Sequence, residues 1–379
     1  MWGVDHVAKV LVRRLLDYDH GLEEAVHALL EPLLPAAGLR SARVLVKPNL
    51  LAPAGPERAV VTHPAVVRAV CQWIVDASDG SAHVLVGDSP AVWPFRTVVR
   101  RSGLEDALKG LPVQVREFKD SVQVSAEPPF HSLELAREAV ESDVVVNLPK
   151  WKTHSQMLLT LAVKNLFGCV VGVRKPQWHM RAGVGADWFA RLLVGICRTV
   201  RPSVHLLDGI LALEGDGPGL GGTARPVGYL LASPSADALD YVVCRMLGLD
   251  ATQLPTLRAA LSLGFEPSTV QVEGNMEAVE EFRLPQTGTV LFGPPKFHHL
   301  QRRHLLRRPE PEAARCQLCG KCWKICPAGA IRESQPAPVF DYDQCIRCFC
   351  CVEVCPFGAL TPREPPLGRL LSLLTRRAW

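Results

Sequence analysis

Two short stretches of the sequence place cysteines at spacings that can do metal chemistry. "CQLCGKCWKICP" begins at Cys316 and "CIRCFCCVEVCP" begins at Cys345, and both fit the pattern C-x2-C-x2-C-x3-C-P. Thiolate sulfur is a soft ligand suited to iron–sulfur clusters, and three cysteines spaced in this way wrap around one cuboidal cluster. Zinc is the alternative, because CxxC pairs also bind zinc. Zinc sites seldom use two such four-cysteine runs that each end in proline, so the pattern predicts iron–sulfur clusters.

The fourth cysteine of each run cannot comfortably close the same cluster as the first three. In two-cluster ferredoxins this cysteine ligates the other cluster. We therefore expect two [4Fe–4S] clusters with crossed ligands. The first cluster would be held by Cys316, Cys319, Cys322 and Cys355. The second cluster would be held by Cys345, Cys348, Cys351 and Cys326. Cys350 falls outside this spacing, and we interpret it as a bystander thiol.

The repeat continues beyond the cysteines. Pro327 is followed by "AGAI" and Pro356 by "FGAL". The stretch from Arg315 to Thr361 resembles the bacterial two-[4Fe–4S] ferredoxin family. The resemblance implies a small α+β ferredoxin-like domain that exchanges single electrons with a donor or acceptor protein.

Upstream of this region, up to about Leu300, the chain alternates apolar runs with helical patterns. "ARVLV", "AHVLV" and "SDVVVNLP" are continuous apolar runs, which a parallel sheet covered on both faces requires. "THPAVVRAVCQWIVDAS" has helical spacing, with Thr62 placed to cap the helix and Pro64 in its first turn. We therefore expect an α/β body with a mainly parallel sheet, in one lobe or two. The expected divisions are a body at 1–300, a linker at 301–314, the ferredoxin-like domain at 315–362 and a basic tail at 363–379.

Polar side chains collect where the predicted strands end. In open α/β sheets, ligands bind outside the carboxyl ends of the strands. Each of these residues, taken alone, is also explained as an ordinary turn residue. Taken together they predict one polar crevice. They are Lys47, Asn49, Asp88, Asn147, Lys150, Lys152, His154 and Asp208.

The segment "PKWKTHSQMLLTLAVKNLFGCVVG" carries the densest group of these residues. We expect an apolar helix that starts after His154 and ends near Lys164 and Asn165. A helix N-terminus beside Lys150 and Lys152 would bind a carboxylate or a phosphate. Lys164 lies among apolar residues, where a lysine either snorkels to solvent or pairs with a carboxylate. If Lys164 is partly buried, its pKa falls and it serves as an acid, a base or an amine nucleophile.

A glycine-rich loop, "ALEGDGPGLGGTARP", runs from Ala212 to Pro226. Its glycines fit G-x-G-x-x-G formally, but "TARPVGYLL" continues as a strand and not as a phosphate-capping helix. We therefore expect a mobile loop that brings Glu214 and Asp216 over the crevice.

Several blocks of the body resemble, in order, the DUF362 family, whose members commonly carry a C-terminal ferredoxin module. The blocks are "VLVKPNLL", "THPAVVRAV", "GDSP", "VVNLPKWKTHSQMLLTLAVKNLFG" and "DGILALEGDGPGLGG". The resemblance implies which positions are shared but not their roles, because the family has no well-established general reaction. The shared positions map onto Lys47, Asn49, His63, Asp88, Asn147, Lys150, His154, Lys164, Asn165, Asp208, Glu214 and Gly215.

These residues lead to a functional prediction. We expect an iron–sulfur oxidoreductase whose ferredoxin domain passes electrons to a small anionic substrate or cofactor in the body. The catalytic candidates are His154, Lys164, Asp88 and Asp208. The substrate-binding candidates are Lys47, Asn49, Asn147, Lys150, Lys152, Asn165 and Glu214. Two alternatives stay open: an electron-transfer subunit or adaptor that only docks a partner enzyme, and a structural role for clusters that never change oxidation state.

Composition narrows the class of protein. The chain has 379 residues, 48% of them hydrophobic, and a formal net charge of +4. This suits two or three domains and gives no strong attraction to nucleic acid, since the basic residues are not interleaved with stacking aromatics. The first residues lack the pattern of an export signal, and no apolar run reaches the ~18 residues of a membrane span. We therefore expect a cytoplasmic protein with no integral membrane segment and no nucleic-acid partner.

Overall fold

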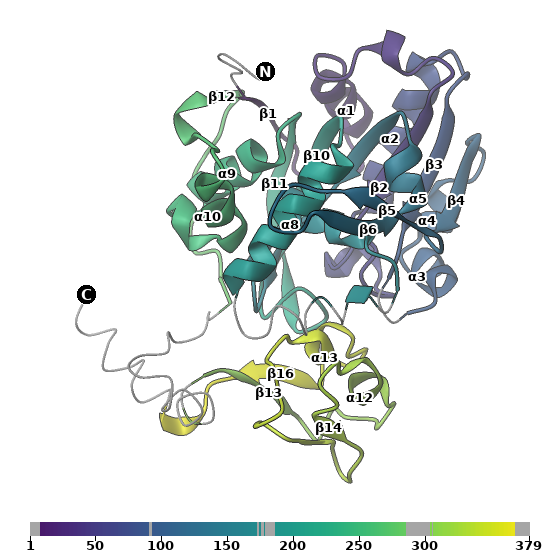
Figure 1. Cartoon of the computed structure of the whole chain (residues 1–379). Coiled ribbons are helices and arrows are strands. Elements are labelled where there is room, and N and C mark those ends of the chain that lie inside the picture. Colours follow the sequence, from purple (N-terminus) through teal and green to yellow (C-terminus); the bar gives the residue numbers. More distant parts are fainter. Residues whose placement is uncertain are drawn as a thin grey trace.

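The computed structural model describes residues 8–90, 93–172, 174–175, 178, 186–285, 304 and 306–367. These residues form a large α/β body and a small C-terminal domain, which lies beneath the body in Figure 1. Residues 368–379, which make up most of the predicted basic tail, lie outside the described residues. Residues 301–303 and 305 of the predicted linker lie outside them too.

One mixed sheet forms the centre of the body. Its strands are β1 (Ala8–Arg14), β2 (Arg43–Pro48), β3 (His83–Asp88), β4 (Val113–Glu117), β7 (Val144–Leu148), β8 (Lys150–His154), β9 (Leu158–Thr160), β10 (Val204–Gly215), β11 (Gly222–Ser233) and β12 (Val270–Glu273). They run in the order β12-β1-β11-β10-β7-β2-β3-β4, with β8 and β9 attached beside β10. From β10 to β4 every pair is parallel, whereas β11 is antiparallel to both of its neighbours. The sheet is therefore mainly parallel, which confirms the predicted fold class.

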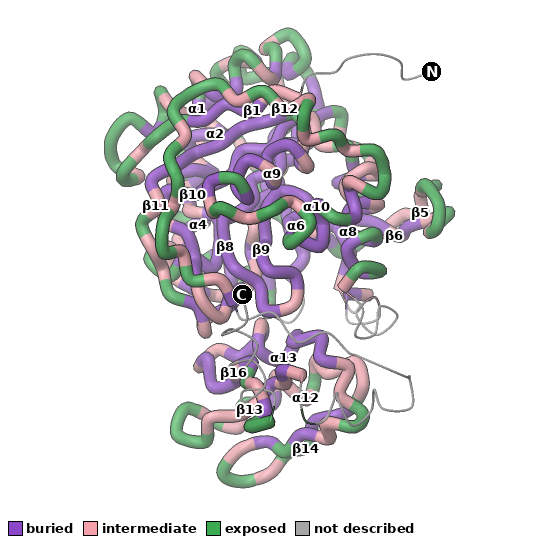
Figure 2. The backbone as a smooth tube through the Cα atoms, turned by 90° about the vertical axis from the view of Figure 1, so that its left-hand side faces the viewer, coloured by how far each residue is buried: buried purple, intermediate pink, exposed green. Residues whose placement is uncertain are grey.

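Helices cover both faces of the sheet. One face is covered by α1 (Leu22–Leu30), α2 (Pro64–Ala77), α3 (Phe95–Arg101) and α4 (Leu104–Ala107). The other face is covered by α8 (Ala186–Val200), α9 (Ala236–Met246) and α10 (Pro255–Ser262), together with α5 (Arg137–Glu141) and the hairpin of β5 (Ser121–Ser125) and β6 (Ser132–Ala136). Val44 and Val46 of β2 pack against the helices on the first face of the sheet, and Leu45 packs against those on the second. Because both faces are covered, these consecutive residues of β2 are all apolar. Figure 2 shows the tubes of β8 and β10 as largely buried. None of the described helices combines the length and the apolar character needed to cross a bilayer.

The sequence predicted Thr62 as the N-cap of α2. In the structure the N-cap is His63. The His63 side chain accepts a hydrogen bond from the Ala65 amide. The Thr62 hydroxyl instead donates to the Leu148 carbonyl (2.7 Å) and accepts from the Asn49 amide (2.8 Å). Thr62 therefore ties together the carboxyl ends of β2 and β7.

The segment after β7 forms a hairpin, not the apolar helix expected from the sequence. Pro149 separates β7 from β8, and both strands pair with β10. A tight turn leads into β9, whose first residue, Leu158, has a φ of 64°. A single helical turn, α6 (Ala162–Asn165), follows, and then a 3-10 turn, η3 (Leu166–Cys169). The prediction of a helix was wrong because residues 158–160 pair with β8 as a strand. Every residue of this strand is buried, so its apolar residues satisfy the strand as well as they would a helix.

The described part of the small domain contains two antiparallel strand pairs and two helical turns. They are β13 (Arg308–Pro311) with β16 (Leu360–Arg363), β14 (Ile331–Arg332) with β15 (Val339–Phe340), α12 (Lys321–Ile325) and α13 (Cys350–Glu353). Because β13 pairs with β16, the structure includes Arg308–Pro311 in the small domain, whereas the sequence placed these residues in the linker. The domain has a core of its own, formed around Ile331, Phe340, Val352 and Leu360.

The glycine-rich loop after β10 packs between the body and the small domain. A Cβ atom on Gly219 would lie 3.0 Å from the Glu353 carbonyl oxygen of α13. The Arg307 side chain donates to the Asp216 carboxylate at 3.1 Å. Glycine at position 219 therefore allows the close approach of the two domains, because any larger residue would meet the backbone of α13.

Candidate functional site between the two domains

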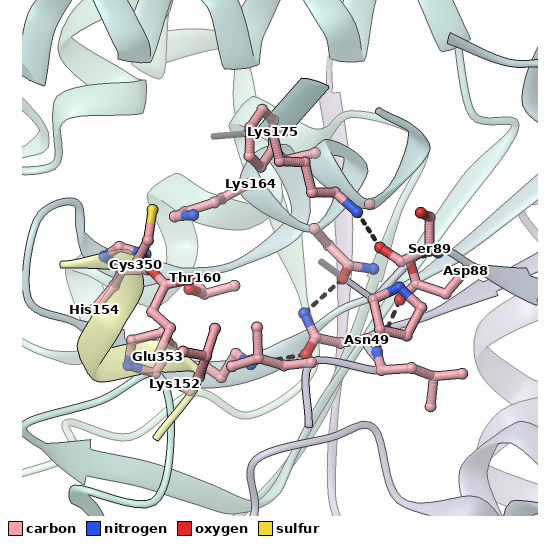
Figure 3. Close-up of a pocket in the computed structure, with 18 of the residues that line it drawn as sticks. Asn49, Asp88, Ser89, Lys152, His154, Thr160, Lys164, Lys175, Cys350 and Glu353 are labelled. Atoms are coloured by element: carbon pink, nitrogen blue, oxygen red, sulfur yellow. Dashed lines mark hydrogen bonds and ion pairs between the residues drawn. The ribbon is translucent and has the colours of Figure 1, made fainter. Parts of the chain in front are cut away.

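A cavity of about 90 Å³ lies where the body meets the small domain (Figure 3). The body lines it with residues from the ends of β3, β8 and β9 and from α6. The small domain lines it with Ile325, Cys350, Glu353 and Val354. The cavity is at the carboxyl edge of the parallel strands, where the sequence predicted a crevice, and the small domain closes one side of it.

A buried ion pair joins the ends of β2 and β3 beside this cavity. Nζ of Lys47 lies 3.0 Å from Oδ1 of Asp88, and both side chains are almost fully buried. Asp88 also accepts hydrogen bonds from the backbone amides of Leu50 and Ser89, each at 2.8 Å. A Cβ atom on Gly168 would lie 2.3 Å from Oδ1, so only glycine lets the chain cross the pair this closely. The charge of Asp88 is therefore already compensated, and its main effect is to hold the strand ends in place.

A row of asparagines fixes the direction of Lys152. The Lys152 ammonium donates to Oδ1 of Asn49 at 2.7 Å. Asn49 donates to Asn165 and Asn165 donates to Asn147, both at 2.8 Å. The row ends at Nδ1 of His205, 2.8 Å from the Asn147 amide nitrogen. Burial lowers the pKa of Lys152 to about 7.

His154 forms a direct contact between the body and the small domain. Its Nδ1 accepts hydrogen bonds from the backbone amides of Gln156 (3.1 Å) and Met157 (3.2 Å). In the neutral ring the proton is therefore on Nε2, which lies 2.9 Å from Oε1 of Glu353. Burial, together with the nearby charge of Lys164, lowers the pKa of His154 to about 4. At pH 7 His154 is neutral and presents an N–H group toward α13.

Two more lysines line the cavity. Nζ of Lys164 lies 5.7 Å from the ring centroids of both Phe167 and Phe189, an arrangement that favours a cation. Within the part of the chain that the structure describes, no hydrogen bond or ion pair holds this amine. Lys175 donates to the carbonyl of Ser89. Burial lowers the pKa of Lys164 and lowers that of Lys175 to about 8. The Lys164 amine thus lies in the cavity lining, with the rings of Phe167 and Phe189 as its neighbours.

Lys150 and Asp208 lie in a separate buried cluster and are not among the described residues that line the cavity. Nζ of Lys150 lies 2.7 Å from Oδ2 of Asp208. Asp208 also accepts hydrogen bonds from the Tyr18 hydroxyl (2.8 Å) and the His63 amide (2.9 Å). The rings of Tyr18 and His63 stack with centroids 3.6 Å apart. Because both oxygens of this carboxylate are engaged, the cluster has the character of a structural anchor between β8, β10 and the start of α2.

Glu214 is also held away from the cavity. Its carboxylate pairs with Arg225 (3.1 Å) and Arg283 (2.7 Å). The predicted approach of Glu214 and Asp216 over the crevice is not seen, because Asp216 pairs with Arg307 instead. Of this loop, Pro218 lines the cavity.

One of the two expected cysteine sets borders a cavity in the small domain. A second cavity is lined by the four expected ligands of the first cluster, Cys316, Cys319, Cys322 and Cys355. Cys345, Cys326 and Cys351 of the second set lie close enough to interact electrostatically. In the described residues no group of three His, Cys, Asp or Glu side chains converges on one metal ion. A cavity bordered by four thiols suits a cuboidal cluster, which is larger than a single ion.

Backbone amides support the crossing cysteine of each repeat. The Ala330 amide donates to Sγ of Cys326 at 3.3 Å, and the Ala359 amide donates to Sγ of Cys355 at 3.2 Å. These alanines occupy equivalent positions in the "AGAI" and "FGAL" stretches. The repeat therefore extends past the cysteines because the same turn directs an N–H group at the sulfur each time.

Family models match both domains. The 4Fe-4S dicluster domain matches residues 309–359. The Domain of unknown function (DUF362) matches residues 44–245, which is more than half of the 379 residues. The chain belongs to the DUF362 family. Both resemblances seen in the sequence are thereby confirmed, and this DUF362 protein is an iron–sulfur protein with an electron-transfer domain of the ferredoxin type.

The DUF362 protein is similar to a curated relative and, more remotely, to solved structures. It is 38% identical over 288 residues to Thylakoid-associated protein sll1697 of Synechocystis sp., covering 74% of this chain and 88% of the relative. The lactate racemase apoprotein of Thermoanaerobacterium thermosaccharolyticum has a TM-score of 0.40 and 10% identity, over 64% of this chain and 57% of that one. A Thermotoga maritima protein has a TM-score of 0.40 and 12% identity, over 72% of this chain and 62% of that one. The DUF362 protein thus spans less than two thirds of either solved chain.

Sequence reasoning missed several groups that line the cavity of the DUF362 domain. Thr160 lies in the stretch expected to be helical, and Lys175 follows a glycine-containing turn with no motif to mark it. Cys350 and Glu353 belong to the other domain, and only docking of α13 brings them here. Recognising β8 and β9 as a hairpin would have placed Thr160 opposite Lys152, and so beside the predicted site.

Proposed function

We propose that the DUF362 domain binds a small anionic ligand in the cavity between the domains, and that the ferredoxin domain exchanges electrons with this ligand. The observation that carries the proposal is the position of α13 (Figure 3). Cys350 and Glu353 of α13 line the cavity. Cys351, which lies between them, belongs to the cysteine set proposed for the second cluster. A ligand in the cavity would therefore lie next to a segment that holds a cluster.

The charges around the cavity support an anionic ligand. Lys152, Lys164 and Lys175 line it, against the two carboxylates of Asp88 and Glu353. The carboxylate of Asp88 is already paired with a buried lysine outside the lining. The lining therefore has excess positive charge in a region of low dielectric constant, where an anion is strongly favoured.

The chain's own groups supply the proton chemistry in this proposal. Bound clusters of this type store and release single electrons. Reduction of a double bond in the ligand consumes two electrons and two protons. The ammonium groups of Lys152 and Lys175, whose pKa values are about 7 and about 8, are the proton donors that line the cavity, and Lys164 orients the anionic end. Asp88, predicted to be catalytic, contributes by holding the strand ends in place.

A test of this proposal follows the oxidation state of the ferredoxin domain. Protein purified without oxygen and chemically reduced is mixed with small unsaturated organic anions, and reoxidation is followed by visible absorbance. We expect one class of anion to reoxidise the protein rapidly, and Lys164→Met to slow this reaction by about 10²-fold or more, because the cation that positions the anionic end is lost. Lys109→Met, at a highly exposed position, is the matched control and is expected to react like the unchanged protein.

A second candidate function is an electron-transfer subunit that passes electrons to a partner protein without chemistry of its own. Cys319, an expected ligand of the first cluster, is exposed, which favours a docking surface for a redox partner. Under this alternative, Lys164→Met would leave electron transfer to a partner unchanged and no small anion would reoxidise the protein. The cytoplasmic location expected from the sequence stays a prediction beside the thylakoid association named for the relative.

The affinity for an anion is expected to fall as the pH rises above neutrality. Burial holds the pKa of Lys152 at about 7 and that of Lys175 at about 8 in the empty protein. An anion stabilises both ammonium groups, so binding above these pKa values requires proton uptake and becomes weaker. Calorimetric titrations between about pH 6 and about pH 9 with a fully ionised anion would check this. An affinity that rises with pH would contradict the assignment of these lysines to the ligand.

A further inference from the structure

Thr160 provides a polar group that the chemistry above does not use. It is 4% exposed, it lines the cavity, and its hydroxyl has no hydrogen-bond partner among the residues that the structure describes. Buried hydroxyls normally have a partner, because an unpaired one loses its hydration without compensation. The position of this hydroxyl therefore indicates a ligand atom beside it.

The hairpin directs Thr160 into the same space as the lysines. Thr160 lies directly opposite Lys152 in the β8–β9 pair, so the two side chains project from one face of the hairpin. Lys164 follows four residues later on α6, with its amine lining the same cavity (Figure 3). Among the described residues, one region of the cavity thus presents a hydroxyl and an amine that both lack a hydrogen-bond acceptor. These are two donors from which a planar carboxylate can accept.

We propose that this region of the cavity binds the carboxylate group of an organic acid, with one oxygen on the Thr160 hydroxyl and the other on the Lys164 amine. The inference deepens the proposed function and rests on it, because it names the class of ligand for the same cavity. It assigns Thr160 as a ligand-binding residue beside the lysines that the sequence had already suggested.

The remaining lining of the cavity decides between an organic acid and an inorganic anion. It is largely apolar and includes Leu50, Leu51, Pro90, Phe167, Pro218 and Val354. Sulfate or phosphate carries oxygen on every side, so some of its oxygens would face this wall without hydrogen bonds. An organic acid places its oxygens at the polar region and buries its carbon chain against the wall. The two kinds of surface in one cavity therefore favour an organic carboxylate.

Saturated carboxylates test this inference without any electron transfer. The full chain, purified without oxygen, is titrated calorimetrically with acetate, propionate and butyrate. We expect affinity to rise about fourfold with each added methylene until the cavity is full. Sulfate and phosphate are expected to bind at least about tenfold more weakly than butyrate, because their outer oxygens lose hydration.

Variants of Thr160 and Lys164 then test which side chains bind the carboxylate group. Thr160→Val keeps the shape of the side chain and is expected to weaken butyrate binding about fivefold, whereas Thr160→Ser keeps the hydroxyl and the affinity. Lys164→Met is expected to weaken binding at least about tenfold, since a charge-assisted hydrogen bond is lost. Lys109→Met serves as the exposed control. Iron content and thermal unfolding show whether each variant retains its fold.

The outcomes separate this inference from the proposed function. Equal affinity for sulfate and butyrate, or unchanged butyrate binding in Thr160→Val, would overturn the carboxylate assignment. The chain-length series uses the unchanged protein, so it decides the matter even if a variant fails to fold. If butyrate binds as expected but no unsaturated carboxylate ever reoxidises the reduced protein, the ligand class stands and the redox function fails.

Discussion

Cys351→Ser is expected to lower the iron content of protein purified without oxygen by about four atoms per chain or more, whereas Cys350→Ser leaves it unchanged. Serine oxygen is a poor substitute for a thiolate in an iron–sulfur cluster. The two residues are neighbours on α13 and both are buried, so the change in bulk and polarity is matched. Iron and acid-labile sulfide analysis, with the visible spectrum, measures the difference.

Loss of the cluster in Cys351→Ser is also expected to change the cavity between the domains. Cys351 and Val352 belong to the core of the small domain, so loss of the cluster loosens α13 and moves Glu353 away from His154. Anion binding should therefore weaken in Cys351→Ser. Cys350→Ser keeps the cluster, so it should not weaken anion binding by displacing α13. Equal loss of iron in both variants would show that the ligand spacing was assigned incorrectly, and zinc in place of iron in the unchanged protein would remove the redox proposal altogether.

Lys150→Met is expected to destabilise the DUF362 domain by about 3–5 kcal/mol, because it leaves the Asp208 carboxylate buried without its cation. Both side chains of this pair are fully buried and their charged atoms are 2.7 Å apart. Denaturant unfolding followed by far-ultraviolet circular dichroism measures the free energy of unfolding. Carboxylate binding by the folded fraction should stay close to that of the unchanged protein, since the pair does not line the cavity.

Two comparisons make the origin of that loss clear. Adding Asp208→Asn to Lys150→Met removes the buried charge. The asparagine oxygen can still accept from the His63 amide and its NH2 group can donate to the Tyr18 hydroxyl, so part of the stability should return. Lys109→Met breaks an exposed pair with Asp106 and should cost at most about 1 kcal/mol. A loss in Lys150→Met as small as that of the exposed pair would mean that the buried cluster is not the structural anchor inferred above.

Local spacing was enough to predict the features that depend on neighbouring residues. The two cysteine runs determine their metal chemistry because three thiols separated by two residues reach one cluster without help from the rest of the fold. The apolar runs that became β2, β3 and β7 predicted buried parallel strands because each strand meets a helical layer on both faces. Strand ends in such a sheet share one edge, so Asp88, Lys152 and His154 were correctly expected to meet.

Long-range pairing decided what those side chains do. Asp208 was expected at the site, but the register of β10 sets it opposite Lys150, and the two neutralise each other. Thr160 and the turn before it depend on β9 pairing with β8, which overrode the helical pattern. Cys350 and Glu353 reach the cavity only because α13 docks on the body, almost two hundred residues away in sequence from His154.

Sequence alone determined that the protein holds metal and a polar strand edge, since both are properties of short segments. Only the tertiary structure placed the two beside one cavity, because contacts between distant segments depend on how whole surfaces fit together.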